Sequence, residues 1–598
     1  MRLQTKRVTA DFLIIGAGTA GCYAALESAR LSNASILLVE KADIARSGCL
    51  AAGVNALNAY IAADSSPEEY VEYACKDGEQ IARYDLLLSM ARGLNDAVRR
   101  LEALGLVILR GPDGAWMPRG KRNIRINGEN IKPLLAGAVC RLPQARVLNR
   151  TAAVRLRVRD GRVCGAFAIS IDEPVLYDIS AKVVLCSTGG AAGLYLPKHS
   201  GFSHHKMWDS PFNVGAGLAM GIQAGAEMTT LEMRFVALRC RDTIAPVGTL
   251  AQGVGARQVN ARGEVYEQRY GLSTNQRVFG TMQEIREGRG PCYLRTVGIS
   301  AEQQEDLYRA YLNMAPSQTL KWLESGSGPS LDNVGIEGTE PSIVGGHTAS
   351  GYWVSTDRQT TITGLFAAGD VAGGCPQKYV TGACAEAAIV ARAALPFFAE
   401  DFLEAAPDEA TRFKAELDAL LEGADGRGAG GGGSRGADGS AGTADAGTDD
   451  KARGYGGGAG GNARDGELRA LELRMQQAMD THAGGIGASY RFSEASLGRA
   501  DEQIAQLTWQ AGMLRAQDMR GLLRIQELRA RLLLCRVLIA HLAARKETRW
   551  PGFGLFEDYP RCDDSWLRYV NSTFHEGAVK IRCRELVRRE ERYEHCDR

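Results

Sequence analysis

The stretch that most constrains the fold of this chain is residues 11–40. An apolar run over residues 12–15 predicts a buried parallel strand, and it leads directly into Gly16-x-Gly18-x-x-Gly21. Helical spacing follows, and a second apolar run over residues 36–39 ends in Glu40, about 20 residues after the glycines. Strand, glycine turn, helix, strand and acid in this order predict a dinucleotide-binding βαβ unit.

Each position of this fingerprint has a chemical reason. Gly16 permits the tight turn, Gly18 lets backbone N–H groups approach a pyrophosphate, and Gly21 lets the helix pack closely on the strand. The helix N-terminus adds partial positive charge near the phosphates, and Glu40 can accept hydrogen bonds from a ribose diol. The alternative, a glycine-rich turn without a ligand, is disfavoured by the second strand and the acid. The residues predicted to bind the dinucleotide here are Gly16, Gly18, Thr19, Ala20, Gly21, Glu40 and Lys41.

Length and charge narrow the class of protein. The chain has 598 residues, enough for several domains with substantial cores. Its net charge of +1 offers no overall field for nucleic acid or an anionic membrane. It lacks the run of about 18 apolar residues that a membrane-spanning helix needs. The first residues run straight into a strand, so we expect no signal peptide and a cytoplasmic protein.

The 14 cysteines are scattered without any C-x-x-C spacing. This pattern argues against a zinc site or an internal iron–sulfur cluster. Many of the cysteines lie in apolar settings, and we interpret them as buried thiols of a reducing compartment. We therefore predict no metal site in the chain.

Three further small-residue segments fit backbone that lies against a flat ligand. Residues 46–58 are too apolar for a surface linker, and the alternative for them is a tight packing loop. The strand over residues 182–186 ends in a glycine turn at the carboxyl edge of the sheet, where ligands bind in open α/β folds. Residues 364–370 end in Gly-Asp and are followed by a helix. The predicted cofactor-binding residues of these segments are Ser47, Gly48, Ala52, Gly53, Thr188, Gly189, Gly190, Gly369, Asp370 and Ala385.

The rest of the sequence predicts helices, a β-meander, one disordered segment and an irregular tail. Amphipathic helices are predicted from near Pro67 and near Asp85, and residues 146–180 predict a β-meander with a hairpin turn at Asp160-Gly161. Residues 422–466 are low-complexity and expected to be disordered, whereas residues 467–546 are expected to be helical. The tail from Trp550 onward is expected to be irregular.

Charged residues suggest where an anion could bind. Residues 110–133 are basic and glycine-rich, with Glu129 as the exceptional acid, and the alternative for them is a solvated loop. Three arginines, including Arg239, surround an apolar strand near residue 238. The histidines of residues 199–205 lack metal-ligand spacing, so this loop is not a metal site.

The motifs together, in this order, resemble the FAD-binding family of succinate dehydrogenase and fumarate reductase flavoproteins and L-aspartate oxidase. The resemblance implies an α/β fold: a Rossmann-like FAD-binding domain interrupted by an α+β capping domain and followed by a helical C-terminal domain. It implies FAD as the cofactor. The expected parts are residues 1–240 and 345–400 for FAD binding, 241–344 for the cap, 401–466 for a helix plus linker, and 467–598 for the C-terminal domain.

Within that family the chain is similar to the adenylylsulfate reductase α-subunit branch. The similarity rests on the segments around Arg46, Arg239, Arg289 and His347, and on Trp550-Pro-Gly-Phe. Gly48 stands where dicarboxylate enzymes of the family carry the histidine that attaches flavin, so FAD is expected to be non-covalent. Their His-Pro-Thr motif is absent near residues 237–242.

The resemblance implies that the protein reduces adenylyl sulfate to sulfite and AMP, or runs the reverse, through a flavin N5–sulfite adduct. Electrons would come from an iron–sulfur, ferredoxin-like β subunit. Arginine forks suit oxyanions, and an aromatic ring suits adenine. The implied catalytic residues are Arg239 and Arg289 for the oxyanions, Trp208 for adenine, His347 as a hydrogen-bond or proton donor, and Asn58 and Glu129 near the flavin.

Two other functions stay open at this level. The first is an enzyme that acts on a dicarboxylate, similar to fumarate reductase, succinate dehydrogenase or L-aspartate oxidase. The second is an FAD-bearing electron-transfer or scaffold subunit without turnover of its own. Residues 234–242 argue against the first, because a dicarboxylate site is expected to supply the missing His-Pro-Thr arrangement there.

Overall fold

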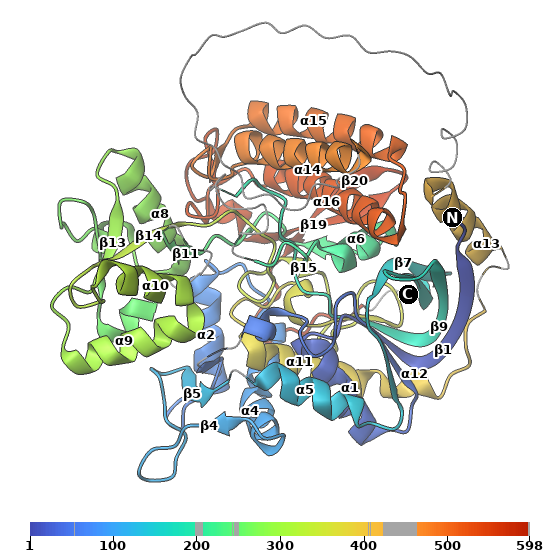
Figure 1. Ribbon diagram of the computed structural model, residues 1–598, viewed down its shortest axis with the longest axis horizontal. Helices are drawn as coiled ribbons and strands as arrows, with labels where there is room; N and C mark the ends of the chain where they lie inside the picture. Colours follow the sequence, from blue (N-terminus) through green and yellow to red (C-terminus); the bar gives the residue numbers. More distant parts are fainter. Residues whose placement is uncertain are drawn as a thin grey trace, which may run out of the picture.

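A computed structural model gives the structure of the chain (Figure 1). It describes residues 1–52, 54, 56–128, 130–197, 207, 209–241, 243, 250–404, 406, 408–421 and 463–595. Among the predicted features, most of the low-complexity segment, Gly53, Glu129 and Trp208 lie outside the described residues.

The N-terminal half is built on a seven-stranded sheet in which the first apolar run is a central strand. Four strands pair in parallel in the order β6-β2-β1-β9, and β16 pairs in parallel with the C-terminal half of β9. This arrangement confirms the predicted α/β fold class. The parallel strands are β1 (Gln4–Ile15), β2 (Ile36–Val39), β6 (Ala145–Leu148), β9 (Val175–Cys186) and β16 (Leu365–Ala367).

The predicted meander extends this sheet. Strands β7 (Thr151–Arg159) and β8 (Arg162–Ser170) form an antiparallel hairpin, and β8 continues antiparallel onto the first half of β9. Asp160 and Gly161 have φ angles of 51° and 72°, as expected for the two central residues of a tight hairpin turn. The hairpin prediction is confirmed.

Helices pack around the parallel strands. α1 and α5 lie beside each other, and α11 packs on α1. The helix predicted near Asp85 is split in two at Gly93, where a Cβ atom would lie 3.1 Å from the Ala385 Cβ of α11. The helices of this part are α1 (Thr19–Leu31), α2 (Pro67–Asp77), α3 (Tyr84–Ala91), α4 (Leu94–Ala103), α5 (Ile131–Cys140), α6 (Ala216–Gln223) and α11 (Tyr379–Ala393).

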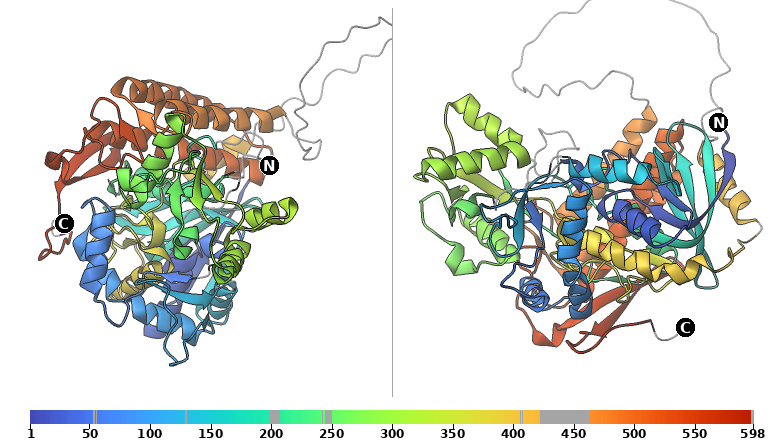
Figure 2. Two further views of the ribbon diagram at one scale, coloured as in Figure 1. Left: turned by 90° about the vertical axis from the view of Figure 1, so that its left-hand side faces the viewer. Right: turned by 90° about the horizontal axis from the view of Figure 1, so that it is seen from below.

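A small α+β unit projects from one side of the molecule as a separate lobe, seen in green in Figures 1 and 2. Its antiparallel sheet has the order β11-β14-β13-β12. The exact domain boundaries stay a prediction. The elements of this lobe, called the cap below, are β11 (Leu238–Cys240), β12 (Arg257–Val259), α7 (Glu267–Tyr270), α8 (Thr274–Arg286), β13 (Cys292–Arg295), α9 (Ala301–Met314), α10 (Pro316–Ser325) and β14 (Val334–Gly338).

The C-terminal part is helical and then turns into strands. Helices α14 (Ala463–His482), α15 (Glu494–Met513) and α16 (Met519–Ala544) pack on one another, which confirms the helical prediction. The tail, however, is not irregular: β19 (Arg568–His575) and β20 (Ala578–Glu585) form a hairpin. β19 pairs with β10 (Met228–Thr229), so backbone hydrogen bonding to a distant segment, which local sequence does not reveal, orders the tail.

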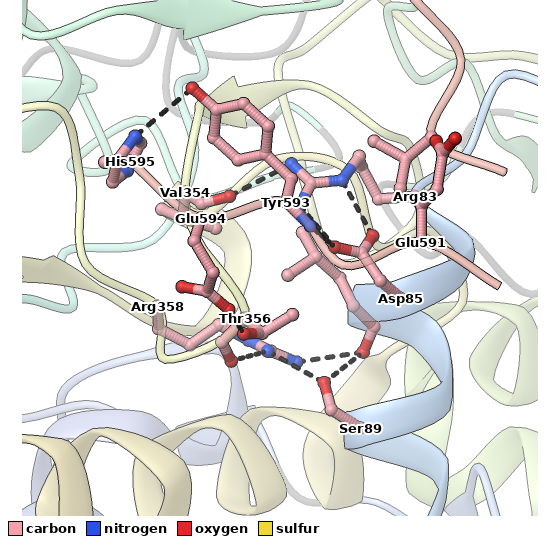
Figure 3. A network of polar contacts seen from close by, with 12 residues as sticks. Arg83, Asp85, Ser89, Val354, Thr356, Arg358, Glu591, Tyr593, Glu594 and His595 are labelled. Carbon is pink, nitrogen blue, oxygen red and sulfur yellow. Dashed lines mark hydrogen bonds and ion pairs between the residues drawn. The ribbon is translucent and has the colours of Figure 1, made fainter. Parts of the chain in front are cut away.

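The last described residues close over a buried ion pair (Figure 3). Arg83 and Asp85 are bonded at 2.6 Å, with side-chain exposures of 0% and 1%. The backbone N–H of Tyr593 donates to Asp85 at 3.1 Å, and the Tyr593 ring lies 5.0 Å from the Arg83 guanidinium carbon. The C-terminal segment therefore contributes to the core of the N-terminal half.

Candidate functional site

A large cavity of about 2500 Å³ lies where the carboxyl edge of the parallel sheet meets the cap and α16. A pocket for one small ligand usually has about 300–1,000 Å³, so this cavity has room for a dinucleotide and a second molecule. Most of the predicted site residues line it. They are Gly16, Gly18, Thr19, Ala20, Glu40, Lys41, Ser47, Gly48, Asn58, Thr188, Gly189, His347, Gly369 and Asp370.

The glycine turn between β1 and α1 has the geometry that the fingerprint requires. Gly16 has a φ of +94°, and a Cβ atom there would lie 2.7 Å from the Ser187 carbonyl oxygen. A Cβ atom on Gly21 would lie 2.0 Å from the Gly16 carbonyl oxygen, so α1 can approach only with glycine at this position. At Gly18 a Cβ atom would meet nothing within 4 Å, since this residue borders the cavity.

Glu40 closes the same turn from the end of β2. Its carboxylate accepts hydrogen bonds from the Ala17 and Ala42 N–H groups, each at 2.8 Å. A carboxylate has about four acceptor positions, so two remain for ligand hydroxyl groups. Because Glu40 is buried and borders the cavity, it is placed to bind a ribose diol.

The segment after Glu40 supports this end of the cavity. The Lys41 ammonium pairs with Glu527 of α16 at 2.6 Å, which joins the C-terminal helices to the dinucleotide end. The Ser47 hydroxyl donates to the Ala17 carbonyl at 3.2 Å. Gly48 has a φ of +79°, which glycine adopts without strain.

The opposite wall combines aromatic and polar side chains. The His347 ring lies between Phe235, at a centroid distance of 4.4 Å, and Tyr379, at 5.2 Å. Burial lowers the pKa of His347 to about 4, so its imidazole is neutral near pH 7. Asn58, at the end of β3 (Ala56–Asn58), borders the same space.

Cations gather where this wall meets the cap. Arg119, Arg122 and Arg125 line the cavity from the segment before and within β5 (Asn123–Asn127), and Arg277 of α8 lines it from the cap. Burial and the neighbouring Arg125 charge lower the pKa of Arg119. The four guanidinium groups along this stretch favour an anionic ligand there.

The carboxyl groups of Asp209 and Asp370 line the cavity near the end where the flavin is expected to bind. Burial, together with the nearby Asp370 charge, raises the pKa of Asp209 to about 7. Burial is also the first cause of the raised pKa of Asp370. Asp209 was not predicted as a site residue.

Two of the predicted catalytic arginines do not line the cavity. Arg239, on β11, lies 3.0 Å from Glu337 of the neighbouring strand β14, and both side chains are buried. Arg289 binds both oxygens of Glu284 at 2.7 Å and also pairs with Glu287. Both cations pair with carboxylates of the cap in this structure, and their predicted role at the substrate stays a prediction.

Three predicted cofactor residues support the site from behind instead of lining it. Gly21 allows the close approach of α1, and a Cβ atom on Gly190 would lie 1.9 Å from the Ile343 carbonyl oxygen. Ala385 of α11 packs against Gly93. Ala52 ends the 3-10 helix η1 (Cys49–Ala52).

The sequence pattern did not single out several residues that the fold brings to the site. Tyr73 of α2 lies under the Arg122 guanidinium at 3.5 Å from the ring centroid, and Tyr379 packs on His347. Only the meeting of distant segments reveals these contacts. One missed residue, Lys132, did leave a signal, because it is a single charge within the apolar helical run over residues 131–139.

Comparison with known proteins decides the family. The family model described as an FAD binding domain matches residues 11–384, more than half of the chain. The chain belongs to this family. The cofactor is therefore FAD, and the glycine turn, Glu40 and the size of the cavity fit it.

Similarity to individual proteins extends beyond this domain. The chain is 29% identical to the adenylylsulfate reductase subunit alpha of Megalodesulfovibrio gigas, over 94% of this chain and 93% of that protein. A solved structure of adenosine-5-phosphosulfate reductase in complex with sulfite as a covalent adduct covers 98% of this chain, with 29% identity and a TM-score of 0.86. The fumarate reductase flavoprotein subunit of Escherichia coli is 26% identical, over 44% of each chain.

The described residues provide neither a metal-binding group of side chains nor a membrane-spanning helix. No group of three or more histidine, cysteine, aspartate or glutamate side chains that could hold a metal ion occurs in the described ranges. None of the helices described is long and apolar enough to cross a membrane.

Proposed function

We propose that this protein is the FAD-bearing, catalytic subunit of an adenylylsulfate reductase, which converts adenylyl sulfate into sulfite and AMP or runs the reverse reaction. The observation that carries the proposal is the extent of the similarity. The adenylylsulfate reductase subunit alpha is similar along 94% of this chain, whereas the sequence similarity to the fumarate reductase subunit covers 44%. This extent supports a function shared with the former.

The charge of the cavity supports an anionic substrate. Arg119, Arg122 and Arg125 line it together with Arg277 of the cap, and planar guanidinium groups bind sulfate or phosphate oxygens with paired hydrogen bonds. We propose that these arginines bind substrate oxyanions in addition to the predicted Arg239 and Arg289. Their charge would also stabilise the negative charge that develops on the departing phosphate.

The uncharged polar residues would orient the substrate. With its pKa lowered to about 4, His347 acts near pH 7 as a neutral hydrogen-bond donor or acceptor and carries no positive charge. Asn58 offers an amide at the neighbouring edge of the cavity. Bound FAD, held without a covalent bond, supplies the two electrons that reduce the sulfur.

The electron donor is proposed to be a second protein. The relative that is similar along most of this chain is named as a subunit alpha, which implies a partner subunit. We therefore propose an iron–sulfur, ferredoxin-like β subunit as the electron-transfer partner, and a cytoplasmic complex.

The test uses the purified chain loaded with FAD. Sulfite should decrease the absorbance of the oxidised flavin, and AMP should change the sulfite concentration required. With a chemically reduced viologen as donor, adenylyl sulfate should be consumed and fumarate should not. Oxidation of the reduced flavin by fumarate alone would favour a dicarboxylate enzyme, and failure of both substrates would favour a scaffold subunit.

A pair of variants connects the activity to the cavity. Arg122→Met removes a cation that lines it, and should raise the KM for adenylyl sulfate about tenfold or more. Arg99→Met removes an exposed cation that pairs with Asp96 and should leave KM unchanged. An unchanged KM for Arg122→Met would contradict the assignment of this wall to the substrate anion.

A further inference from the structure

Lys132 is a fully buried lysine directly behind the glycine turn. It is the second residue of α5, and its side chain is 0% exposed. Its ammonium donates to the Ala17 carbonyl oxygen and lies 3.6 Å from the Cys22 sulfur. It does not line the cavity, so it acts from the protein side of the turn.

Among the described residues, no carboxylate forms a direct ion pair with the Lys132 ammonium, although the buried Glu40 lies in the same region and acts on the neighbouring Cys22. Cys22 is not a thiolate, because burial raises the pKa of its thiol, and the thiol itself donates to the Ala17 carbonyl at 3.2 Å. Burying a cation away from a direct counter-ion is costly, so an anion bound on the cavity side of the turn would stabilise it.

The position of the Ala17 carbonyl determines where the next N–H group points. Lys132, Ser47 and Cys22 all donate to this oxygen, which holds it on the protein side. In a trans peptide the C=O and the following N–H point in opposite directions. The Gly18 N–H is therefore turned away from Lys132, towards the cavity that Gly18 lines.

We propose that Lys132 is a positioning residue of the FAD site. Its ammonium holds the Ala17–Gly18 peptide so that the Gly18 N–H faces the FAD diphosphate, and it places a positive charge behind that diphosphate. The diphosphate in turn is the anion that stabilises the buried ammonium. This role depends on the FAD family membership and not on the identity of the substrate.

Three variants of the full chain separate this role from a structural one. Lys132→Met removes both the donor and the charge, and Lys132→Gln keeps a donor without the charge. Lys182→Met is the matched control, because the Lys182 ammonium also binds a backbone carbonyl, that of Phe398 at 2.8 Å, but pairs with Asp11 and lies outside the cavity lining.

Two measurements are made on each variant: the thermal midpoint of the FAD-free protein, and the FAD dissociation constant from quenching of flavin fluorescence. Lys132→Met should weaken FAD binding about 10- to 100-fold, as for a lost hydrogen bond with a charged group. Its FAD-free midpoint should stay equal or rise, since a buried charge without a direct counter-ion is gone. Lys132→Gln should be intermediate, and Lys182→Met should lower the midpoint without changing FAD affinity.

An FAD dissociation constant within twofold of the unmodified protein for both Lys132 variants would overturn the proposal. A large fall of the FAD-free midpoint with unchanged affinity would do the same, because it is the result expected of a structural lysine. If Lys132→Met does not fold, Lys132→Gln carries the comparison, and failure of both to fold would assign Lys132 to the core of the domain.

Discussion

The guanidinium of Arg239 lies 3.0 Å from the carboxylate of Glu337, across neighbouring strands of the cap sheet, with side-chain exposures of 1% and 3%. This pair joins β11 to β14 in the register that places the two residues opposite each other. A buried charge that loses its partner is strongly destabilising. Arg239 therefore stabilises the cap through its pair with Glu337.

Replacing Arg239 by Met should lower the free energy of unfolding by about 3–5 kcal/mol, measured by urea denaturation, because Glu337 is left buried without a counter-ion. The double variant with Glu337→Leu should recover much of this loss. Arg99→Ala, in an exposed pair, should change it by less than about 0.5 kcal/mol. A stable Arg239→Met protein without activity would instead support the catalytic role that the sequence suggested.

Substitutions of two glycines in the turn should affect the stability of the protein and its FAD affinity separately. Gly21→Ala places a Cβ atom 2.0 Å from the Gly16 carbonyl oxygen, so the FAD-free protein should lose stability as α1 is displaced. Gly18→Ala meets nothing within 4 Å and has an ordinary φ of −71°, so its FAD-free stability should be unchanged. Its methyl group borders the cavity, however, and should weaken FAD binding in a fluorescence titration. Equal FAD affinity for Gly18→Ala would place the diphosphate elsewhere.

His347 should make stability depend on pH. Its pKa falls from 6.5 to about 4 on folding, so the unfolded chain binds the extra proton between these values. The free energy of unfolding should thus decrease as the pH falls from about 6.5 to about 4, by on the order of 2 kcal/mol. His347→Asn should remove this contribution, whereas His575→Asn, at an exposed position, should not. The same pH slope in both variants would show that the pKa of His347 does not change on folding.

The C-terminal segment should stabilise the N-terminal half. Tyr593→Ala removes a ring that packs on Arg83 and on Trp353, at 5.0 and 4.9 Å, and should cost about 1–2 kcal/mol in thermal or urea denaturation. Arg588→Ala breaks an exposed pair with Glu591 of the same segment and serves as the control. Equal stability of the two variants would mean that the segment merely rests on the surface.

Local rules predicted much of the fold. The glycine turn, the strands on either side of it and the Asp160-Gly161 hairpin follow from backbone conformations that only certain residues permit. The strands β19 and β20 could not be predicted in the same way, because β19 is ordered by pairing with β10, more than half the chain away. The cofactor end of the site was predictable for the same reason as the turn, since glycines and an acid at fixed spacing have few other uses.

The sequence by itself determined that this chain binds a dinucleotide, because the residues of the fingerprint are close in sequence and each affects the conformation of its near neighbours. Only the tertiary structure decided which charged groups reach the cavity. Arg239 and Arg289 have their carboxylate partners within the cap, Arg122 reaches the cavity, and Lys132 is buried behind the turn. A charge takes its role from what lies within a few ångströms of it, and for these residues the fold, not the local sequence, sets those neighbours.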